Sequence, residues 1–453
     1  MLDRHAEAAA LWDAHVNPQF VRVLRTLGFD RTWVRGEGAY LIDDRGGRWL
    51  DLQSGFGTFA LGRNHPEVKR ALHEAIDADT PSLPAMGLSW LPGVLAEQLV
   101  ARAPAHLDAV VFANSGAESV EAAIKLARAA TGRTRVLYAT KAFHGLTTGA
   151  LALNGGAEFR ERFGPLLPGA DAVPFGDLDA LGAALRAGDV AAFLVEPIQG
   201  KGVNLPPDGY LAGAQALCHE HGALLALDEV QTGLGRTGRF LALEHWGVEP
   251  DLVTLAKALS GGFVPIGAVL TTRRVRDAVF DSMERAVVHG STFSGGDLAA
   301  AAGLATLRVL DDEGLVERAA RMGELLAELT RPLAERHEIV REVRGKGLLW
   351  ALELGPPEGA AARRLWAAVE RRQQGLLAQL VTVPLFHEHR MLIQVAAHHS
   401  SVVKALPPLT IEEADVHRFA RALDDVLGRA SRHLLSRTGR LVGGLGARAL
   451  AAR

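Results

Sequence analysis

The sequence has little of several features that other classes of protein require. Only one cysteine, Cys218, occurs among 453 residues, which excludes an internal disulfide and any metal site built from several cysteines. No uninterrupted apolar run approaches the roughly 20 residues of a membrane-spanning helix. Met1 is followed by acidic residues and not by an apolar leader segment. We therefore expect a cytoplasmic protein that does not enter a membrane.

An excess of charge of one sign is also missing. The chain carries 49 Lys and Arg residues against 52 Asp and Glu residues, for a net charge of −3. Such a balance argues against a protein that binds nucleic acid or an anionic membrane surface through bulk charge. Hydrophobic residues make up 48% of the chain, enough for a sizeable core, and the length favours one large domain with a smaller one.

Lysine is the scarce cation, since only seven of the 49 basic residues are lysines. A lysine ammonium can lose its proton and form an imine, whereas a guanidinium cannot usefully do either. The few lysines are therefore enriched for positions where arginine would not serve.

The middle of the chain predicts an α/β fold with a mostly parallel sheet. Short apolar runs without alternation cover residues 110–112, 135–138, 192–195, 224–227, 252–255 and 266–270. Continuous runs of this kind are typical of strands buried on both faces. Residues 118–130 and 211–221 are expected to form crossover helices that cover the sheet.

The two ends of the chain predict a second, smaller α/β unit. We expect one helix over residues 6–27, two strands around a Gly-Gly turn within residues 40–52, and strands at residues 347–354 and 391–395. The expected division is a large domain at 60–320, a small domain from 1–59 with 321–428, and a basic tail at 429–453. That tail reads as a solvated extension or, alternatively, as a docking helix.

Ionisable residues follow three of the apolar runs. Glu196 and Asp228 come directly after their runs, Lys257 follows soon after the third, and successive members are about 30 residues apart. This spacing fits one strand and one helix each, so all three should lie at the carboxyl edge of the sheet, where open α/β sheets bind their ligands. Buried charged residues of this kind are common at catalytic sites. The alternative is that Asp228 and Lys257 form an ion pair with a purely structural role.

A candidate phosphate site begins a predicted helix. Asn114-Ser115-Gly116-Ala117-Glu118 follows the first central run, and backbone amides at a helix N-terminus bind phosphate. The same residues can act only as an N-cap. Residues 289–296 form a second hydroxyl-rich segment that could contact phosphate.

Phosphate, acid and lysine at one sheet edge suit pyridoxal 5'-phosphate. The lysine would form the Schiff base, and the carboxylate would keep the pyridine nitrogen protonated. The released lysine could then move a proton between substrate and cofactor. Phe143 is a candidate to pack on the ring, and we expect its neighbour His144 to line the pocket. No metal site is expected, because the paired histidines at 219–221 and 387–389 lack ligand spacing.

Six motifs in order resemble those of class III aminotransferases, such as the ornithine, acetylornithine and putrescine enzymes. The motifs are Asn-Ser-Gly-Ala-Glu at 114–118, Phe-His-Gly at 143–145, Glu-Pro-Ile-Gln-Gly at 196–200, Leu-Asp-Glu-Val-Gln-Thr-Gly-Leu-Gly-Arg-Thr-Gly at 227–238, Ala-Lys-Ala-Leu-Ser-Gly-Gly at 256–262 and Gly-Ser-Thr-Phe at 290–293. The similarity runs from about residue 35 to about residue 423. It implies the fold of fold type I pyridoxal-phosphate transferases.

This resemblance implies roles for residues around the cofactor ring. Lys257 looks like the Schiff-base lysine and Asp228 like the partner of the pyridine nitrogen. Gln231 is implied to bond the ring hydroxyl, with Val230 and Phe143 packing on the two ring faces.

The resemblance also implies how the phosphate is held. The phosphate loop would consist of Ser115, Gly116 and Ala117. Thr292 is similar to the threonine that reaches the phosphate of a neighbouring subunit, which implies a homodimer with shared active sites. Glu196 and His144 complete the expected cofactor pocket.

Three departures from the ornithine-type pattern concern the substrate. Leu146 and Lys404 stand where those enzymes have arginines, and Lys201 stands where they have a glutamate. A guanidinium grips a carboxylate through two bonds and lysine is only a point charge, so the usual carboxylate clamp is altered. Lys201 can equally be a solvated cation.

We therefore predict transamination between a primary amine, or an aldehyde in reverse, and a 2-oxo acid by ping-pong half-reactions. The amine is expected to be a diamine, an omega-amino compound or the amine that corresponds to a biosynthetic aldehyde. The alternatives are an aminomutase, racemase or decarboxylase on the same scaffold, an ornithine or acetylornithine aminotransferase, an enzyme acting on a carrier-tethered aldehyde, and a catalytically silent scaffold protein.

Overall fold

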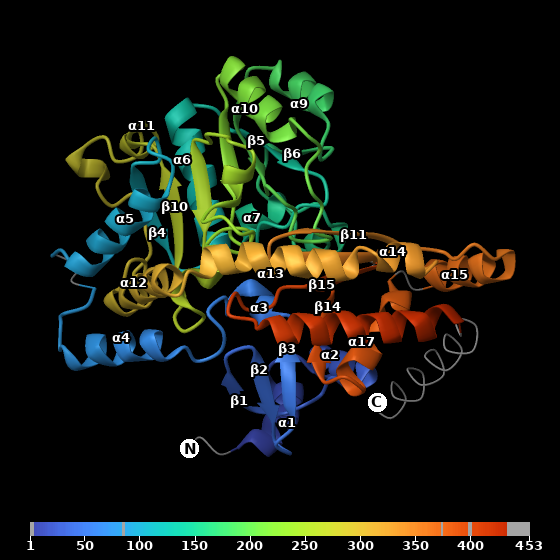
Figure 1. Cartoon of the computed structure of the whole chain (residues 1–453). Helices are drawn as coiled ribbons and strands as arrows, with labels where there is room; N and C mark the ends of the chain where they lie inside the picture. Colours follow the sequence, from blue (N-terminus) through green and yellow to red (C-terminus); the bar gives the residue numbers. More distant parts are fainter. Residues whose placement is uncertain (1–3, 84–86, 373–374, 397–400, 433–453) are drawn as a thin grey trace. The chain divides into compact units, whose positions relative to one another are not determined.

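The computed structural model describes residues 4–83, 87–372, 375–396 and 401–432. The chain divides into two compact units. The first combines residues 1–54 with 322–453, and the second is the continuous stretch 55–321. The sequence-based boundaries lie at 59/60 and 320/321. Each unit is described by itself below (Figure 1).

The continuous unit is built on a sheet of seven strands. They are β4 (Ala109–Ala113), β5 (Arg135–Ala139), β6 (Ala170–Val173), β7 (Val190–Val195), β8 (Leu224–Asp228), β9 (Leu252–Leu255) and β10 (Gly267–Thr271). Their order is β4-β10-β9-β8-β7-β5-β6. The pairs among β9, β8, β7, β5 and β6 are parallel, while β10 runs antiparallel to both of its neighbours. The predicted mostly parallel sheet is therefore confirmed.

Burial explains which strands could be predicted. All residues of β7, β8 and β9 are buried, as continuous apolar runs require. The strand β6 was not expected. It pairs only with β5 and leaves Asp171 and Ala172 exposed, so its sequence needs no apolar run.

Helices cover the sheet of this unit. The helix α6 (Gly116–Thr131) contacts β4, β7, β8, β9 and β10, and α10 (Tyr210–Glu220) contacts β8. These two confirm the predicted crossover helices. Further α-helices of this unit include α4 (Pro66–Asp77), α5 (Trp90–Arg102), α7 (Thr148–Ala152), α8 (Ala157–Arg160), α9 (Leu178–Leu185), α11 (Arg273–Asp277) and α12 (Asp297–Asp312), and the short α3 (Ser54–Gly57) begins at its boundary.

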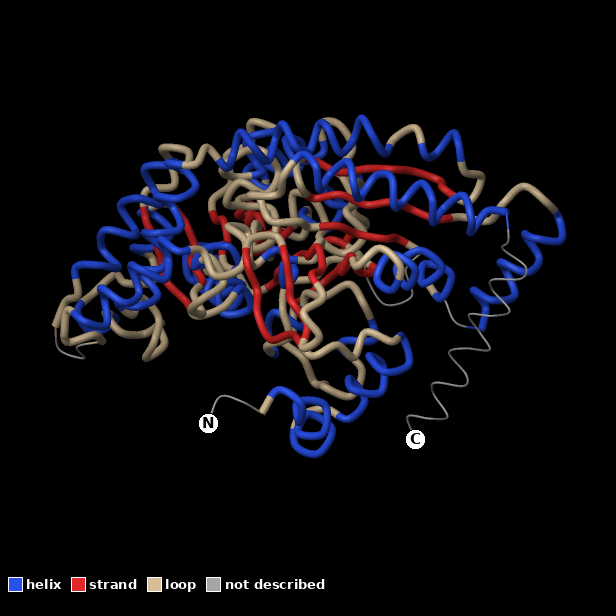
Figure 2. Tube along the Cα trace, turned by 60° about the horizontal axis from the view of Figure 1, so that its bottom comes forward, coloured by secondary structure: helices blue, strands red, loops and turns tan. Residues whose placement is uncertain are grey.

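The unit formed by both chain ends contains two small sheets. Figure 2 draws the strands of both units in red. One has the order β1-β2-β3-β13 and the other the order β11-β12-β15-β14. Their strands are β1 (Trp33–Glu37), β2 (Tyr40–Asp43), β3 (Arg48–Asp51), β11 (Val340–Lys346), β12 (Leu349–Leu354), β13 (Met391–Leu392), β14 (Gln394–Val395) and β15 (Val402–Ala405). The expected hairpin within residues 40–52 is confirmed by the antiparallel pairing of β2 with β3.

Several long helices accompany these sheets. They are α15 (Ala360–Arg372), α16 (Gln379–His387) and α17 (Glu413–Arg432), with most of α13 (Leu315–Thr330). Residues 429–432 of the predicted tail continue α17, where Arg429 forms an ion pair with Asp425 at 2.7 Å. The rest of that tail, residues 433–453, lies outside the described residues.

Two predicted elements of this unit are wrong in their extent. The single helix expected over residues 6–27 is broken into α1 (Ala8–His15) and α2 (Pro18–Leu27). Proline has no N–H and favours the first position of a helix, and the Asn17 side chain accepts a hydrogen bond from Phe20 N at 3.0 Å. The strand expected at 391–395 is split between the two sheets, because β13 pairs with β3 and β14 with β15.

Within the described ranges, no helix combines the length and the apolar character needed to cross a bilayer.

Candidate active site

A buried carboxylate at the end of β8 is the centre of the site. Asp228 Oδ2 lies 2.7 Å from His144 Nδ1. Its other oxygen, Oδ1, accepts hydrogen bonds from Val230 N and Thr254 Oγ1, both at 3.0 Å. Three donors therefore orient this carboxylate and satisfy it where water is excluded.

His144 is fixed behind that carboxylate. Because a carboxylate only accepts, His144 Nδ1 donates to Asp228. The backbone N of His144 donates to Asn154 Oδ1 at 2.7 Å, and Asn154 Nδ2 donates to Gly145 O at 2.7 Å. Within the described part of the chain, the buried His144 Nε2 has no hydrogen-bond partner. The imidazole thus has one ring nitrogen assigned to Asp228 and one left for another group.

Glu196, directly after β7, accepts hydrogen bonds from two loops. Its Oε1 accepts a hydrogen bond from Phe143 N at 3.0 Å, and its Oε2 accepts one from Gly200 N at 2.6 Å. Burial is the main cause that raises the pKa of Glu196, with Asp228 adding to the effect and His144 opposing it. The carboxyl group therefore holds the Phe143 loop next to the turn after β7.

Lys257 begins the short 3-10 helix η3 (Lys257–Ser260) after β9 and is partly buried. Burial lowers the pKa of its ammonium, while the negative charges of Asp228 and Glu196 act in the opposite direction. Desolvation favours the neutral amine, which is the nucleophilic form of lysine. The structure therefore brings Glu196, Asp228 and Lys257 together at the carboxyl ends of β7, β8 and β9, as the spacing predicted.

The amino end of α6 faces the same edge of the sheet. Ser115 caps the helix, with its side chain accepting from Glu118 N at 3.2 Å. A Cβ atom on Gly116 would lie 2.7 Å from Val230 Cγ1. The backbone at Gly145 has φ +130°, and a Cβ there would lie 2.6 Å from Ala117 Cβ. Glycine at both positions lets the chain approach the first helical amides, which have no partner within the helix.

Gln231 and its neighbours form one wall of this region. Gln231 Nε2 donates to Phe56 O at 2.9 Å, and a Cβ on Gly200 would lie 2.5 Å from Gln231 Oε1. The preceding Glu229 is buried and accepts from Ala242 N at 2.6 Å. It also accepts from Leu243 N at 2.8 Å and from the Thr232 hydroxyl at 3.1 Å.

The predicted substrate residues Leu146 and Lys404, and Thr292, do not share one environment. Leu146 is exposed directly after Gly145, and Thr292 is exposed in a loop joined to the start of α6, where Asn114 Nδ2 donates to Ser291 Oγ at 2.9 Å. Lys404 is buried in β15 of the other unit, so its role stays a prediction.

Lys201 lies against two phenyl rings near Glu196. Its Nζ lies 3.4 Å from the ring centroid of Phe159 and 4.6 Å from that of Phe143. Burial lowers the pKa of Lys201 to about 8, with Glu158 and Glu196 opposing that shift. Lys201 is thus not a freely solvated cation.

Comparison with known proteins identifies the family. The model of the family described as aminotransferase class-III matches residues 27–427, which is most of the chain. This chain is a class-III aminotransferase family member. The expectation from the six motifs is confirmed, and the chain is an enzyme of a family that depends on pyridoxal 5'-phosphate.

Two curated relatives of this class-III chain are similar over nearly all of it. The aminotransferase PigE of a Serratia species is 36% identical over 451 residues, or 92% of this chain and 53% of that protein. The chain thus spans about half the length of PigE. The putrescine aminotransferase of Pectobacterium atrosepticum is 39% identical over 436 residues, covering 93% of this chain and 88% of that protein.

Solved structures show the same fold. An ornithine aminotransferase from Toxoplasma gondii aligns with a TM-score of 0.81 and 30% identity, covering 95% of this chain and 97% of the other. An (S)-enantioselective omega-transaminase from Thermomicrobium roseum gives a TM-score of 0.82 and 30% identity, covering 93% and 98%. The class-III chain therefore has the fold of the fold type I transferases.

The residues of this class-III chain fit pyridoxal 5'-phosphate. Lys257 supplies an amine whose desolvation favours the neutral form, and Asp228 supplies an oriented carboxylate. The helix that begins at Gly116 supplies amides for an anion, with the close approach to Val230 kept open by the missing side chain.

Sequence reasoning missed two residues of this site. Thr254 and Asn154 are buried polar residues that bind Asp228 and the His144 backbone. A polar side chain within a fully apolar strand needs a partner, so Thr254 in the run at 252–255 offered a signal.

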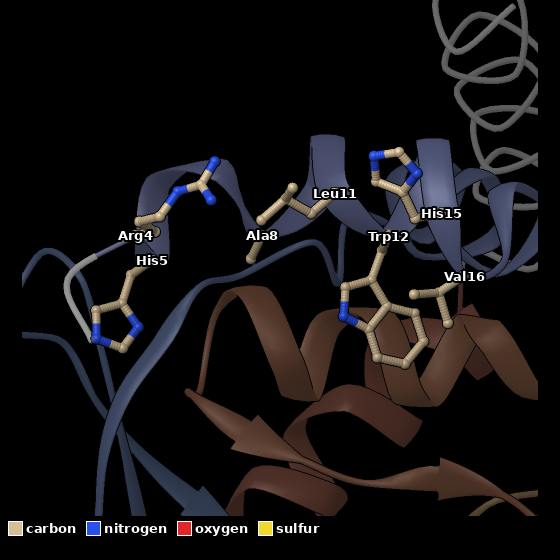
Figure 3. Close-up of a pocket in the computed structure, with 7 residues that line it drawn as sticks. All are labelled: Arg4, His5, Ala8, Leu11, Trp12, His15 and Val16. Carbon is tan, nitrogen blue, oxygen red and sulfur yellow. The ribbon is translucent and has the colours of Figure 1, made fainter. Parts of the chain in front are cut away.

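A separate hollow of about 510 Å³ lies on the N-terminal segment and contains none of these residues (Figure 3). It is lined by Arg4, His5, Ala8, Leu11, Trp12, His15 and Val16. Its lining offers neither a lysine nor a carboxylate, so it carries none of the chemistry of the Lys257 site.

Proposed function

We propose that this enzyme transfers the amino group of a primary amine to a 2-oxo acid in two half-reactions, with Lys257 and Asp228 as its catalytic residues. The observation that carries the proposal is the partly buried Lys257 ammonium, on which the charges of Asp228 and Glu196 act. A desolvated cation with a lowered pKa, next to two carboxyl groups in a family of this kind, fits a reacting group better than a structural ion pair.

Each residue of the central group has a distinct task. Bound pyridoxal 5'-phosphate supplies a ring that withdraws electrons from the carbon that carries the reacting amine. Asp228 would hold the proton of the ring nitrogen, and His144 with Thr254 would keep its carboxylate oriented. Lys257, whose pKa is lowered by desolvation, would accept a proton from the substrate carbon and deliver it to the cofactor.

Other residues would position the cofactor. The phosphate would lie at the start of α6, held by Ser115, Gly116 and Ala117. Phe143 and Val230 would enclose the ring, and Gln231 would bond its hydroxyl. Glu196 supports this arrangement through its bond to Phe143 N, and His144 would line the pocket through its contact with Asp228.

The proposed amine is a diamine, an omega-amino compound or the amine of a biosynthetic aldehyde. A relative named putrescine aminotransferase and a solved structure named omega-transaminase support this class. The replacements at Leu146, Lys201 and Lys404 support it too, because none of the three is the arginine or glutamate of the ornithine-type pattern.

We also propose that the enzyme is a homodimer. The large apolar side chains of Leu88, Trp90, Met283, Val287 and Phe293 are exposed, with 92% of Met283 and 90% of Val287 accessible. Large exposed apolar areas mark protein interfaces.

The segment that holds Leu88 and Trp90 touches the segment that follows Phe293. Ser89 donates to Asp297, and a Cβ on Gly296 would lie 3.2 Å from Leu83. The exposed loop with Thr292 is part of this surface, which supports the role of Thr292 in a partner's site. Residence in the cytoplasm also stays a prediction.

The test is an absorbance spectrum of the purified protein with added pyridoxal 5'-phosphate, followed by titration with amines and then with pyruvate or 2-oxoglutarate. We expect a visible band that disappears with some amines and returns with a 2-oxo acid. Lys257→Ala should never develop the band, because the described site places no other lysine beside Asp228.

A matched control is Lys69→Ala, which removes an exposed lysine in α4. This variant should behave as the wild type. A protein without the visible band at excess cofactor, or one whose band no amine changes, would contradict the proposal and favour a silent scaffold.

A further inference from the structure

Asn154 follows α7 by two residues and is fully buried. Its Oδ1 accepts a hydrogen bond from His144 N, and its Nδ2 donates one to Gly145 O, both at 2.7 Å. The side-chain amide therefore spans two residues of the neighbouring loop and fixes their backbone from both ends. A buried amide whose two ends are satisfied in this way is held in one orientation.

Gly155 brings the same segment against that loop. Its N donates to Ala142 O at 2.9 Å. A Cβ atom on Gly155 would lie 2.2 Å from Lys141 N, so this close approach requires glycine. Lys141 itself has a φ of +65°, in the left-handed region that residues other than glycine rarely adopt. Residues 154 and 155 therefore lie along the loop from 141 to 145 and hold its backbone.

The imidazole of His144 depends on this backbone. Among the residues that the structure describes, the ring has one hydrogen-bond partner, Asp228, whose Oδ2 lies 2.7 Å from Nδ1, while the buried Nε2 has none. No second hydrogen bond of the ring can therefore correct a displacement of the loop. Because a hydrogen bond weakens steeply when its alignment is poor, such a displacement would pass directly to the contact with Asp228.

We propose that Asn154 is a positioning residue of the amino transfer, which acts through His144 to aim the Asp228 carboxylate. The inference rests on the proposed function, in which Asp228 holds the proton of the ring nitrogen. Val230 N and Thr254 Oγ1 both donate to Oδ1 of that carboxylate, so the bond from His144 sets the direction of Oδ2. The described hydrogen bonds of the Asn154 side chain go to the loop backbone, so its effect on the carboxylate is indirect.

The first measurement is the downfield Nδ1–H proton resonance of His144 in the cofactor-free full chain, identified by its absence in His144→Gln. Asn154→Leu has a similar shape but makes neither bond, and its proton should exchange with water roughly tenfold faster or more. Asn154→Ser, whose hydroxyl can accept from His144 N, should give an intermediate rate. The resonance of His337, whose Nε2 lies 2.6 Å from Asp424 Oδ1 in the other unit, should stay unchanged.

The second measurement is the Kd of pyridoxal 5'-phosphate, obtained by titration. We expect Asn154→Leu to raise Kd roughly tenfold in the wild-type background and by less than about twofold in the His144→Gln background, because the effect passes through the imidazole. A merely structural contribution would be equal in the two backgrounds. Thr330→Val is the stability control, since this buried hydroxyl of the other unit accepts from Trp350 Nε1 at 3.0 Å. Its loss should lower stability and leave Kd unchanged.

Turnover separates this role from a substrate contact. The amines are 1,4-diaminobutane, 1-aminobutane and 4-aminobutanoate, each with the same 2-oxo acid. Asn154→Ser should lower kcat for all three by one common factor and leave the ratios of kcat/KM among them unchanged, because Asn154 acts on the cofactor end of the reaction. A change in these ratios would place Asn154 in substrate recognition and overturn the inference.

The outcomes distinguish this inference from the proposed function. If the wild type forms no visible band with pyridoxal 5'-phosphate and consumes no amine, the proposed function fails and the inference falls with it. If the wild type is active but the His144 proton exchanges at the wild-type rate in both Asn154 variants, the positioning role alone is wrong. A tenfold rise in Kd that persists in the His144→Gln background also contradicts it. Asn154→Ser carries both comparisons if the leucine variant does not fold.

Discussion

Replacing Glu229 by glutamine should change how stability depends on pH. This carboxyl group is buried and accepts hydrogen bonds from Ala242 N, Leu243 N and the Thr232 hydroxyl. Burial raises the pKa of Glu229 to about 7, although these donors act to lower it. In the unfolded chain the group returns to its ordinary value of 4.5.

The sign follows from the proton that each state binds. Between pH 4.5 and 7, the folded protein keeps a proton on Glu229 that the unfolded chain has lost. The stability from this group is complete below pH 4.5 and is lost as the pH rises through 7. One pKa unit corresponds to about 1.4 kcal/mol, so the loss over this window is about 3 kcal/mol.

Glutamine at position 229 does not titrate, so the variant lacks this loss. It also cannot accept through both side-chain termini, which costs a constant amount of stability at every pH. We therefore expect the free energy of unfolding of Glu229→Gln, relative to the wild type, to rise by about 3 kcal/mol between pH 4.5 and 7. Above about pH 8 it should stay level.

The assay is urea denaturation at fixed protein concentration without added cofactor, because a ligand of the folded state would shift apparent stability. The exposed Glu97→Gln, in α5, provides the baseline for charge removal. A difference between Glu229→Gln and wild type that stays constant from pH 4.5 to 8 would refute the reasoning, since Glu229 would then be ionised throughout.

Two further predictions concern the groups that hold the cofactor site. Thr254→Val removes a buried donor from Asp228 Oδ1, so it should lower the free energy of unfolding by about 1.5–3 kcal/mol and weaken cofactor binding in a fluorescence titration. Thr254→Ser should restore both the stability and the affinity. Unchanged values in the valine variant would contradict the role of this bond. Gly116→Ala places a Cβ 2.7 Å from Val230 Cγ1 and should weaken cofactor binding at least tenfold in the same titration. Gly93→Ala, with open space at its Cβ, is the control, and equal affinities of the two alanine variants would count against the cradle at α6.

Local sequence patterns determined the family, the sheet and the position of the reacting groups. Continuous apolar runs predict strands buried on both faces, and Glu196, Asp228 and Lys257 follow three of them. Parallel strands end at one edge, so these residues had to lie near each other wherever the rest of the chain went. The structure brings them together after β7, β8 and β9.

Strands that form through pairing with their neighbours, without an apolar run of their own, could not be predicted from the sequence. The strand β6 lies at an edge with two exposed residues, and β15 lies between β12 and β14, which come from separate parts of the chain. The helix expected over residues 6–27 shows the opposite error, because apolar spacing concealed the break that Asn17 and Pro18 introduce.

Only the tertiary structure decided the surroundings of the site residues. The partners of Asp228 come from the loop at His144 and from Thr254 in β9, which are far apart in the sequence. From the sequence alone, Lys201 could be either a solvated cation or a substrate contact. Its place against Phe143 and Phe159 depends on the loops after β5 and β7 and the helix α8 meeting in space. Contacts of that kind arise from packing, which no local pattern of residues encodes.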